Sequence, residues 1–223
     1  IAAMMAAVHR SPDGPAMRIA SLSALTHPMS VDLLADKTLA RARVIALRVI
    51  GGEAFFAYGV EVLRRVARQS GATLLIVPGE PAFDEELAAR GTADPAHARL
   101  FHAFCREAGP QNRDKALALL RHLAGDGARP APPVPVPAAG LYARGALVRD
   151  LTALAAAMPD GPRVGLVFYR AHVMDGLTGG IDGLVEALVE AGLAPVPIFA
   201  TSLKDPVAAP VVRQLLAAAG CRL

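Results

Sequence analysis

The sequence lacks the short motifs by which many enzymes handle nucleotides, acyl groups or catalytic zinc. It contains no G-x-x-x-x-G-K-[ST] loop, no G-x-S-x-G elbow and no H-E-x-x-H pair. The first motif would cradle phosphates, the second would present a nucleophilic serine, and the third would hold zinc on one helix face. No standard device for ATP hydrolysis is therefore present in this sequence.

Cysteine and aromatic residues are also scarce. The two cysteines, Cys105 and Cys221, lie in different segments without a C-x-x-C partner, which indicates a reduced, cytoplasmic setting. Tryptophan is absent, and aromatic residues make up 4% of a chain that is 53% hydrophobic. This composition predicts a core filled by Ala, Leu and Val.

Basic charge is in only slight excess, because 23 Lys and Arg residues face 20 Asp and Glu residues for a net charge of +3. The two signs are interspersed, so no nucleic-acid footprint is expected. Residues 1–8 are apolar but too few to span a membrane, and no basic segment precedes them as in a signal peptide. They are expected to be the tail of a helix. A predicted helix over 207–219 stops at Gly220, and residues 221–223 are expected to begin a further strand, so the chain is expected to be a fragment of something longer.

The most informative stretch runs from Gly161 to Pro206 and predicts a strand, a loop, a helix and a second strand. Val164–Tyr169 is a continuous apolar run, typical of a parallel strand that is buried on both faces. A loop over 175–180 leads to apolar residues with helical spacing over 181–189, and Gly192 stands where a helix C′ residue belongs. The strand Pro195–Ala200 follows. A right-handed crossover makes the two strands parallel and adjacent.

Polar residues follow both strands, at the edge where open α/β sheets bind their ligands. Arg170 and His172 come after the first strand, and Thr201, Ser202 and Lys204 after the second. We expect these five residues to form a substrate-binding crevice that suits carboxylates. Alternatively, Arg170 forms a structural salt bridge with a neighbouring acid, His172 is a satisfied loop histidine, and Lys204 is simply solvated.

The first half of the chain predicts a βαβαβ arrangement. Ser30 is expected to cap a helix from Val31 to about Ala40, and another helix buries a face that includes Val62 and Val66. The expected strands are Met17–Leu22, Val44–Ile50 and Thr73–Val77. Their carboxyl ends offer three residues that can bind a metal or a proton, namely His27, Glu53 and Glu80.

Two of these residues, His27 and Glu53, are the candidate metal ligands. Each also has a structural interpretation, since His27 precedes a proline in a turn and Glu53 can cap the following helix. The aromatic cluster Phe55, Phe56 and Tyr58 fits hydrophobic core better than a platform for a flat ligand.

A proline-rich segment divides the chain. Asp94 and Pro95 predict a helix start, and a second helix runs on to about Leu123. Residues 125–137 contain five prolines, which favour an extended linker. The expected domains are residues 1–124, an amino-terminal α/β lobe with two trailing helices, and 138–223, a second α/β lobe that opens with a strand over 138–142 and a helix over 147–158. The predicted fold class is α/β, with two Rossmann- or flavodoxin-like lobes whose sheets are mostly parallel.

Three runs of sequence resemble one protein family. They are HPMSVDLLADKTLARARVIALRVIGGEAFFAYGVE (27–61), GPQNRDKALALLRHLAG (109–125) and VGLVFYRAHVMDGLTGGIDGLVEALVEAGLAPVPIFATSLKDP (164–206). Together, and in this order, they resemble the large subunit of cobaltochelatase, a relative of the magnesium chelatase porphyrin-binding subunit. The features HPMSVD and GGEAFFAYG favour the cobalt branch of the family.

The resemblance implies a reaction and its participants. In this family the large subunit binds the tetrapyrrole and the metal, while an AAA+ ATPase subunit and a metal-ion-dependent-adhesion-type subunit drive insertion. The implied reaction is ATP-dependent insertion of Co²⁺, a substrate, into hydrogenobyrinic acid a,c-diamide, with ATP bound by the partner subunits rather than by this chain. This fragment alone is expected to be inactive.

Three other functions remain open at this point. One is the porphyrin-binding subunit of magnesium chelatase. A second is a non-catalytic protein that holds a small molecule between two α/β lobes. The third is a docking module that only assembles partner subunits, with the chemistry in parts of the protein outside this sequence.

Overall fold

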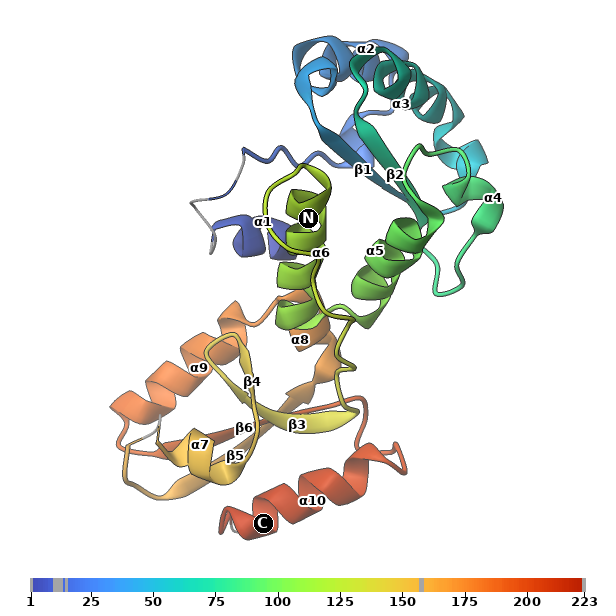
Figure 1. Ribbon diagram of the computed structural model, residues 1–223. Coiled ribbons are helices and arrows are strands. Elements are labelled where there is room, and N and C mark those ends of the chain that lie inside the picture. The colour runs from blue at the N-terminus through green and yellow to red at the C-terminus, as the bar shows by residue number, and fades with distance from the viewer. Residues whose placement is uncertain (1, 10–13, 15, 157–158, 222–223) are drawn as a thin grey trace. The chain divides into compact units, whose positions relative to one another are not determined.

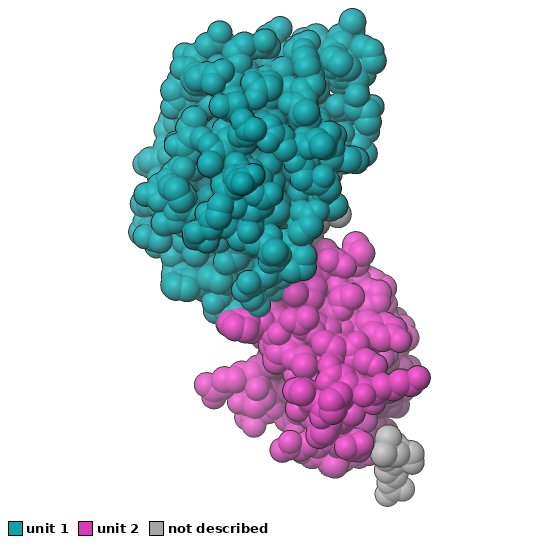
Figure 2. All heavy atoms as spheres, turned by 90° about the vertical axis from the view of Figure 1, so that its right-hand side faces the viewer, with its two compact units in different colours: residues 1–134 teal, residues 135–223 magenta. Residues whose placement is uncertain are grey.

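The computed structural model describes residues 2–9, 14, 16–156 and 159–221 (Figure 1). The chain divides into two compact units, unit 1 over residues 1–134 and unit 2 over residues 135–223, which Figure 2 shows in teal and magenta. The boundary between them falls inside the proline-rich segment 125–137. Among the described residues, no helix has the length and apolar character needed to cross a membrane.

Unit 1 is built around two parallel strands, β1 (Val44–Val49) and β2 (Thr73–Pro78), paired in register from Val44 opposite Thr73 to Val49 opposite Pro78. Helix α3 (Ala57–Ser70) makes the crossover and buries Val62, Leu63, Val66 and Ala67, as predicted. It ends at Gly71, whose φ of +74° is the left-handed conformation that favours glycine. This β1–α3–β2 unit confirms the expected crossover between the second and third predicted strands.

Two local predictions in unit 1 are wrong, one for a strand and one for the start of a helix. Residues 17–21 form no strand, and the chain turns into a 3-10 helix, η1 (Leu22–Ala24), because the Ser21 hydroxyl accepts the Ser23 N–H. Helix α2 (Pro28–Lys37) begins before Ser30, because His27 Nδ1 accepts the Met29 N–H at 3.2 Å. A proline in the first turn then presets the helical φ. His27 is therefore the N-cap of α2.

Helices cover both faces of the two-stranded sheet. Residues of α2 and α3 pack with Ile45, Leu74 and Ile76 on one face. Residues of α5 and α6 pack with Leu75 and Val77 on the other. The remaining elements of unit 1 are α1 (Ala2–His9), η2 (Leu39–Arg41), η3 (Glu53–Phe56), α4 (Glu85–Ala88), α5 (Pro95–Glu107) and α6 (Gly109–Leu123). Asp94 caps α5 through the Ala96 N–H, as predicted.

Unit 2 contains a four-stranded sheet in the order β4-β3-β6-β5. Its strands are β3 (Ala139–Ala143), β4 (Ala146–Val148), β5 (Arg163–Tyr169) and β6 (Ala194–Ala200). Strands β5 and β6 are parallel neighbours, as expected, whereas β3 runs antiparallel to both β4 and β6. The predicted α/β class is therefore confirmed, and the sheet of unit 2 is mixed.

The β3–β4 hairpin replaces the first part of the helix predicted over 147–158. Arg144 and Gly145 both have positive φ, +43° and +83°, which is the geometry of a tight two-residue hairpin turn. Helix α7 begins only at Leu151 and ends at Ala155, with Asp150 accepting the Ala153 N–H. Residues 157–158 of the predicted helix lie outside the described residues, as do Ile1, Arg222 and Leu223 at the chain ends.

The stretch between β5 and β6 holds two helices, α8 (Arg170–Asp175) and α9 (Gly179–Glu190). Gly192 is at C′ of α9, where its N–H reaches Val189 O and the Leu193 N–H reaches Leu188 O, which confirms the predicted C-cap. The prediction that β5 is buried on both faces is wrong, because Phe168 is the only buried residue in this edge strand. Helices α9 and α10 (Ala208–Ala218) pack on opposite faces of the sheet.

Candidate functional site

The carboxyl ends of β5 and β6 lie side by side, as the sequence predicts. Tyr169 is paired with Ala200, so Arg170 and Thr201 leave the sheet next to each other. Parallel strands are about 5 Å apart, which puts residues that follow them within reach of one small ligand. This edge of unit 2 is the first candidate site.

Arg170 is anchored to the backbone of its own unit. Its Nε donates to Pro137 O at 2.8 Å and one terminal nitrogen, Nη2, donates to Val136 O at 2.7 Å. These bonds match neither predicted role of Arg170, which was to bind a ligand carboxylate or to form a salt bridge with an acidic side chain. Both bonds are made to main-chain carbonyl oxygens instead. Arg170 keeps its charge at the sheet edge, but much of its hydrogen-bonding capacity is used in holding residues 136–137.

His172 and Lys204 are less constrained. The His172 ring lies on the short helix α8, half-buried, with its centroid 6.4 Å from that of the Phe168 ring. Lys204 is exposed, and among the described residues its ammonium group has no hydrogen-bond or ion-pair partner. These two side chains are therefore the ones at this edge that remain available to an anionic ligand.

Thr201 and Ser202 take part in the turn that leads to α10. The Thr201 hydroxyl donates to an Asp205 carboxylate oxygen at 2.5 Å, and Ser202 Oγ accepts the Lys204 N–H at 3.1 Å. The other Asp205 oxygen accepts the N–H groups of Val207 and Ala208. The Thr201 hydrogen bond, followed by these backbone bonds, lowers the pKa of Asp205. A carboxylate is thus held beside the expected anion site, where it opposes the binding of another.

A second candidate site lies at the carboxyl edge of β1 and β2. An open pocket of about 530 Å³ is found there, lined by Gly52, Pro78, Glu80, Ala82, Phe83 and residues 84–86. Glu80 Oε1 accepts the Gly51 N–H at 2.6 Å, and this bond is the main reason that the pKa of Glu80 is lowered. The loop that carries Glu80 is held by the buried His102, whose Nε2 lies 2.9 Å from Glu80 O.

The two candidate metal ligands have other partners in unit 1. His27 caps α2, and Glu53 Oε2 lies 3.0 Å from Arg90 Nε in an ion pair. Within the described part of the chain, no group of three or more His, Cys, Asp or Glu side chains is arranged to hold a metal ion. Their role as metal ligands remains a prediction.

The aromatic cluster divides into a buried and an exposed part. Phe56 packs into the core, and its ring leaves no room for a Cβ at Gly59. Phe55 is 68% exposed next to Gly51, and Tyr58 is about half exposed with its hydroxyl donating to Asp32 at 2.8 Å. The expectation of hydrophobic core is correct for Phe56 and wrong for Phe55.

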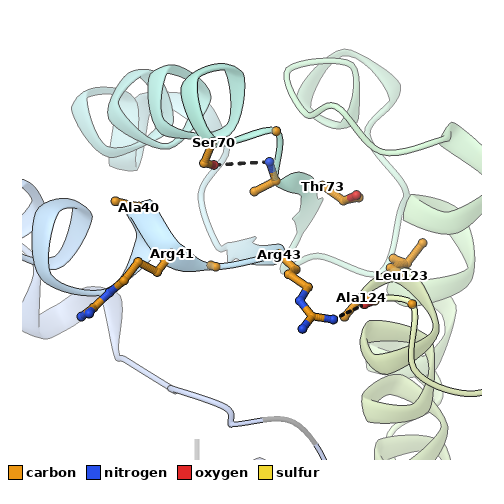
Figure 3. A pocket seen from close by; sticks show the side chains of 11 residues that line it. Ala40, Arg41, Arg43, Ser70, Thr73, Leu123 and Ala124 are labelled. Carbon is orange, nitrogen blue, oxygen red and sulfur yellow. Dashed lines mark hydrogen bonds between the residues drawn. The ribbon is translucent and has the colours of Figure 1, made fainter.

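A further pocket, of about 520 Å³, lies at the opposite edge of the β1–β2 sheet and was not predicted from the sequence (Figure 3). Figure 3 shows Arg43 extended toward Ala124, and its Nη1 donates to Ala124 O at 3.1 Å. Arg41 donates to Lys37 O at 2.8 Å. The carboxyl ends of α3 and α6 both line this pocket, and their carbonyl dipoles disfavour the binding of an anion. Arg41 and Arg43 serve as caps for helix carboxyl ends rather than as anion ligands.

Other functional or structural residues that the sequence analysis missed are buried polar groups. Tyr142 is 1% exposed, donates to both carboxylate oxygens of Asp182 at 2.8 and 3.0 Å, and accepts the Gly145 N–H. Burial raises the pKa of Tyr142. Asn112 is also 1% exposed and bonds the backbone of Val134. The one sequence signal for these residues is a polar side chain, Tyr142 or Asn112, at a position that faces the apolar side of its strand or helix.

Comparisons with known proteins bear on both units. Residues 102–222 match the family model described as CobN/Magnesium Chelatase. Two proteins named aerobic cobaltochelatase subunit CobN are similar to the chain. The one from Sinorhizobium sp is 32% identical over 213 residues, and the one from Pseudomonas aeruginosa is 34% identical over 195 residues.

A solved structure is similar as well. The catalytic subunit of cobaltochelatase from Mycobacterium tuberculosis matches 98% of this chain with a TM-score of 0.71 and 28% identity. The alignments cover 91% and 86% of this chain in the two curated relatives. They cover only 17% and 16% of those relatives, and 16% of the solved chain. Because the family model matches more than half of its length, the chain belongs to the CobN/magnesium chelatase family.

Proposed function

We propose that this chain is part of the tetrapyrrole- and metal-binding subunit of an ATP-dependent cobaltochelatase. The reaction is insertion of Co²⁺ into hydrogenobyrinic acid a,c-diamide, with the AAA+ ATPase subunit and the metal-ion-dependent-adhesion-type subunit as partners. The observation that carries this proposal is the similarity to two proteins named aerobic cobaltochelatase subunit CobN over 86–91% of the chain. A role in magnesium chelatase is the less favoured reading, because both of these relatives carry the cobalt name.

The carboxyl edge of unit 2 is the proposed contact with the carboxylate-bearing substrate. His172 and Lys204 are the groups whose side chains remain available there, and Arg170 adds its positive charge while it anchors the backbone. Thr201 and Ser202 shape the turn that carries Lys204. An exposed cation contributes up to about 1 kcal/mol to such a contact, because water screens it.

A metal-handling role for His27 and Glu53 stays part of the proposal for the carboxyl edge of unit 1. Both side chains have protein partners in the structure, His27 as an N-cap and Glu53 with Arg90. Cobalt binding there would compete with these partners, which makes tight binding by the isolated chain unfavourable.

A docking module is the second candidate function, and one observation favours it. Ile50 and Phe55 are each 68% exposed around Gly51 and Gly79, on a chain that spans about a sixth of its relatives. Exposed apolar side chains that lie together mark surfaces that other protein parts cover. In this reading the chain assembles the complex and the chemistry lies elsewhere.

A reconstitution assay tests the proposed function. The 223-residue chain alone should insert no cobalt, with or without ATP. The full-length subunit with both partner subunits should insert it only when ATP is present. Cobalt insertion by the isolated chain, or an ATP-supplied complex that inserts magnesium in preference to cobalt, would contradict the proposal.

A further inference from the structure

The proline-rich segment between the units is not a free linker, because its first part is bound to unit 1. The buried side chain of Asn112 donates to Val134 O at 2.7 Å and accepts the Val134 N–H at 2.8 Å. The same amide nitrogen of Asn112 also donates to Ala108 O. Upstream, Lys115 Nζ donates to Pro132 O at 2.6 Å. Both backbone groups of Val134 are thus fixed to helix α6.

The end of the segment is bound to unit 2 in the same way. Arg170 donates to the carbonyls of Val136 and Pro137 at 2.7 and 2.8 Å. The Val136 side chain is 8% exposed and packs with Tyr142, Phe168 and Phe199. Between the anchored carbonyls of Val134 and Val136, the one peptide group without such an anchor in the described structure is that joining Pro135 to Val136.

Few backbone rotations remain between the two anchored carbonyls, those of Val134 and Val136. The pyrrolidine ring fixes φ of Pro135 near −65°. Pro137 restricts Val136 to extended conformations, which removes most of the freedom in its ψ. Two soft dihedral angles are left, ψ of Pro135 and φ of Val136.

We propose that these two dihedral angles are the pivot about which the two units reorient. The rest of the segment 125–137 is carried as part of one unit or the other, with Asn112 and Arg170 as the two anchors. The conformational range between the units is therefore set by a pivot of two residues rather than by a flexible chain of thirteen. This inference rests on the contacts of the segment and is independent of the reaction proposed above.

Two matched glycine variants of the 223-residue chain test the pivot. Pro135→Gly frees the fixed φ at the pivot, and Pro132→Gly makes the same chemical change in the anchored part. Both prolines are exposed, so neither change removes core packing. Spin labels at Gln69→Cys in α3 and Glu186→Cys in α9, with both native cysteines replaced by alanine, report the distribution of distances between the units by electron double resonance.

The pivot predicts that Pro135→Gly broadens the distribution by roughly half or more, while Pro132→Gly leaves it unchanged. Equal broadening by both variants, or no broadening by either, would overturn the proposal. An independent measurement needs no variant. The Val134 amide should exchange with solvent at least about tenfold more slowly than in an unstructured peptide, because Asn112 holds it. Exchange at the unstructured rate would also overturn the proposal.

Discussion

Replacing Arg170 with alanine separates an anchoring role from a ligand-binding role. The side chain donates two hydrogen bonds from a charged group to the carbonyls of Val136 and Pro137. Such bonds contribute about 1.5–3 kcal/mol each when buried, and water replaces part of each at a half-exposed position. We expect Arg170→Ala to lower the free energy of unfolding of unit 2 by about 2–3 kcal/mol in total.

Hydrogen exchange followed by mass spectrometry measures this loss in each unit separately. Peptides from the fully buried strand β6 (Ala194–Ala200) should exchange about 30- to 150-fold faster in Arg170→Ala, while peptides from β2 should not change. Lys204→Ala is the matched control. It removes one cation from the same edge, and the ammonium group of Lys204 has no hydrogen-bond partner in the described structure. If β6 exchanges at the same rate in both variants, the anchoring role of Arg170 is refuted.

Three further predictions concern stability, reactivity and pH. Tyr142→Phe should destabilise unit 2 by about 1–3 kcal/mol, because Asp182 loses its buried donor, and an unchanged urea midpoint would show that the pair is not structural. Cys105 should react with iodoacetamide at pH 8 more slowly than Cys221, because burial raises the pKa of Cys105 to about 11; equal rates would contradict this. The pKa of Glu80 is lowered in the folded chain, so the stability that Glu80 adds is present above pH 4.5 and is lost as the pH falls through the lowered pKa. Glu80→Gln should reduce the acid sensitivity of urea unfolding, and an identical pH profile would rule out that contribution.

The parts of the fold that the sequence predicts are set by local patterns. The crossover from β5 to β6 follows from two apolar runs around a helical stripe, and Gly192 ends α9 because only its left-handed φ of +76° closes the helix. The cap at Asp94 is equally local. In each case the residues that decide the structure lie within one turn or one strand of each other.

The parts that were not predictable depend on distant partners or on weak turn signals. The hairpin at Arg144 and Gly145 lacks the Asn-Gly or Asp-Gly pair that normally marks such turns, so the sequence pattern predicts a helix where its second strand lies. The apolar run of β5 suggested burial on both faces, although the strand lies at the sheet edge. Burial of a strand's two faces depends on the elements that pack on them, which its own residues do not specify.

The candidate site shows the same limit. The parallel pairing of β5 with β6, which puts the ends of both strands at one edge, follows from topology, and the structure agrees. The partners of Arg170 lie 33 and 34 residues away in the proline-rich segment, so no local pattern could show that this side chain is an anchor. The bond from Thr201 to Asp205 is local and could have been anticipated from their spacing.

The most direct test of the proposed function is an absorbance titration of the 223-residue chain with hydrogenobyrinic acid a,c-diamide. We predict a saturable spectral shift whose affinity falls about two- to tenfold in a His172→Ala and Lys204→Ala double variant. Affinity should be unchanged in Arg213→Ala, which removes an exposed cation from α10 instead. A chain that gives no spectral shift, at concentrations where the full-length subunit does, would contradict substrate binding here and leave docking as its function.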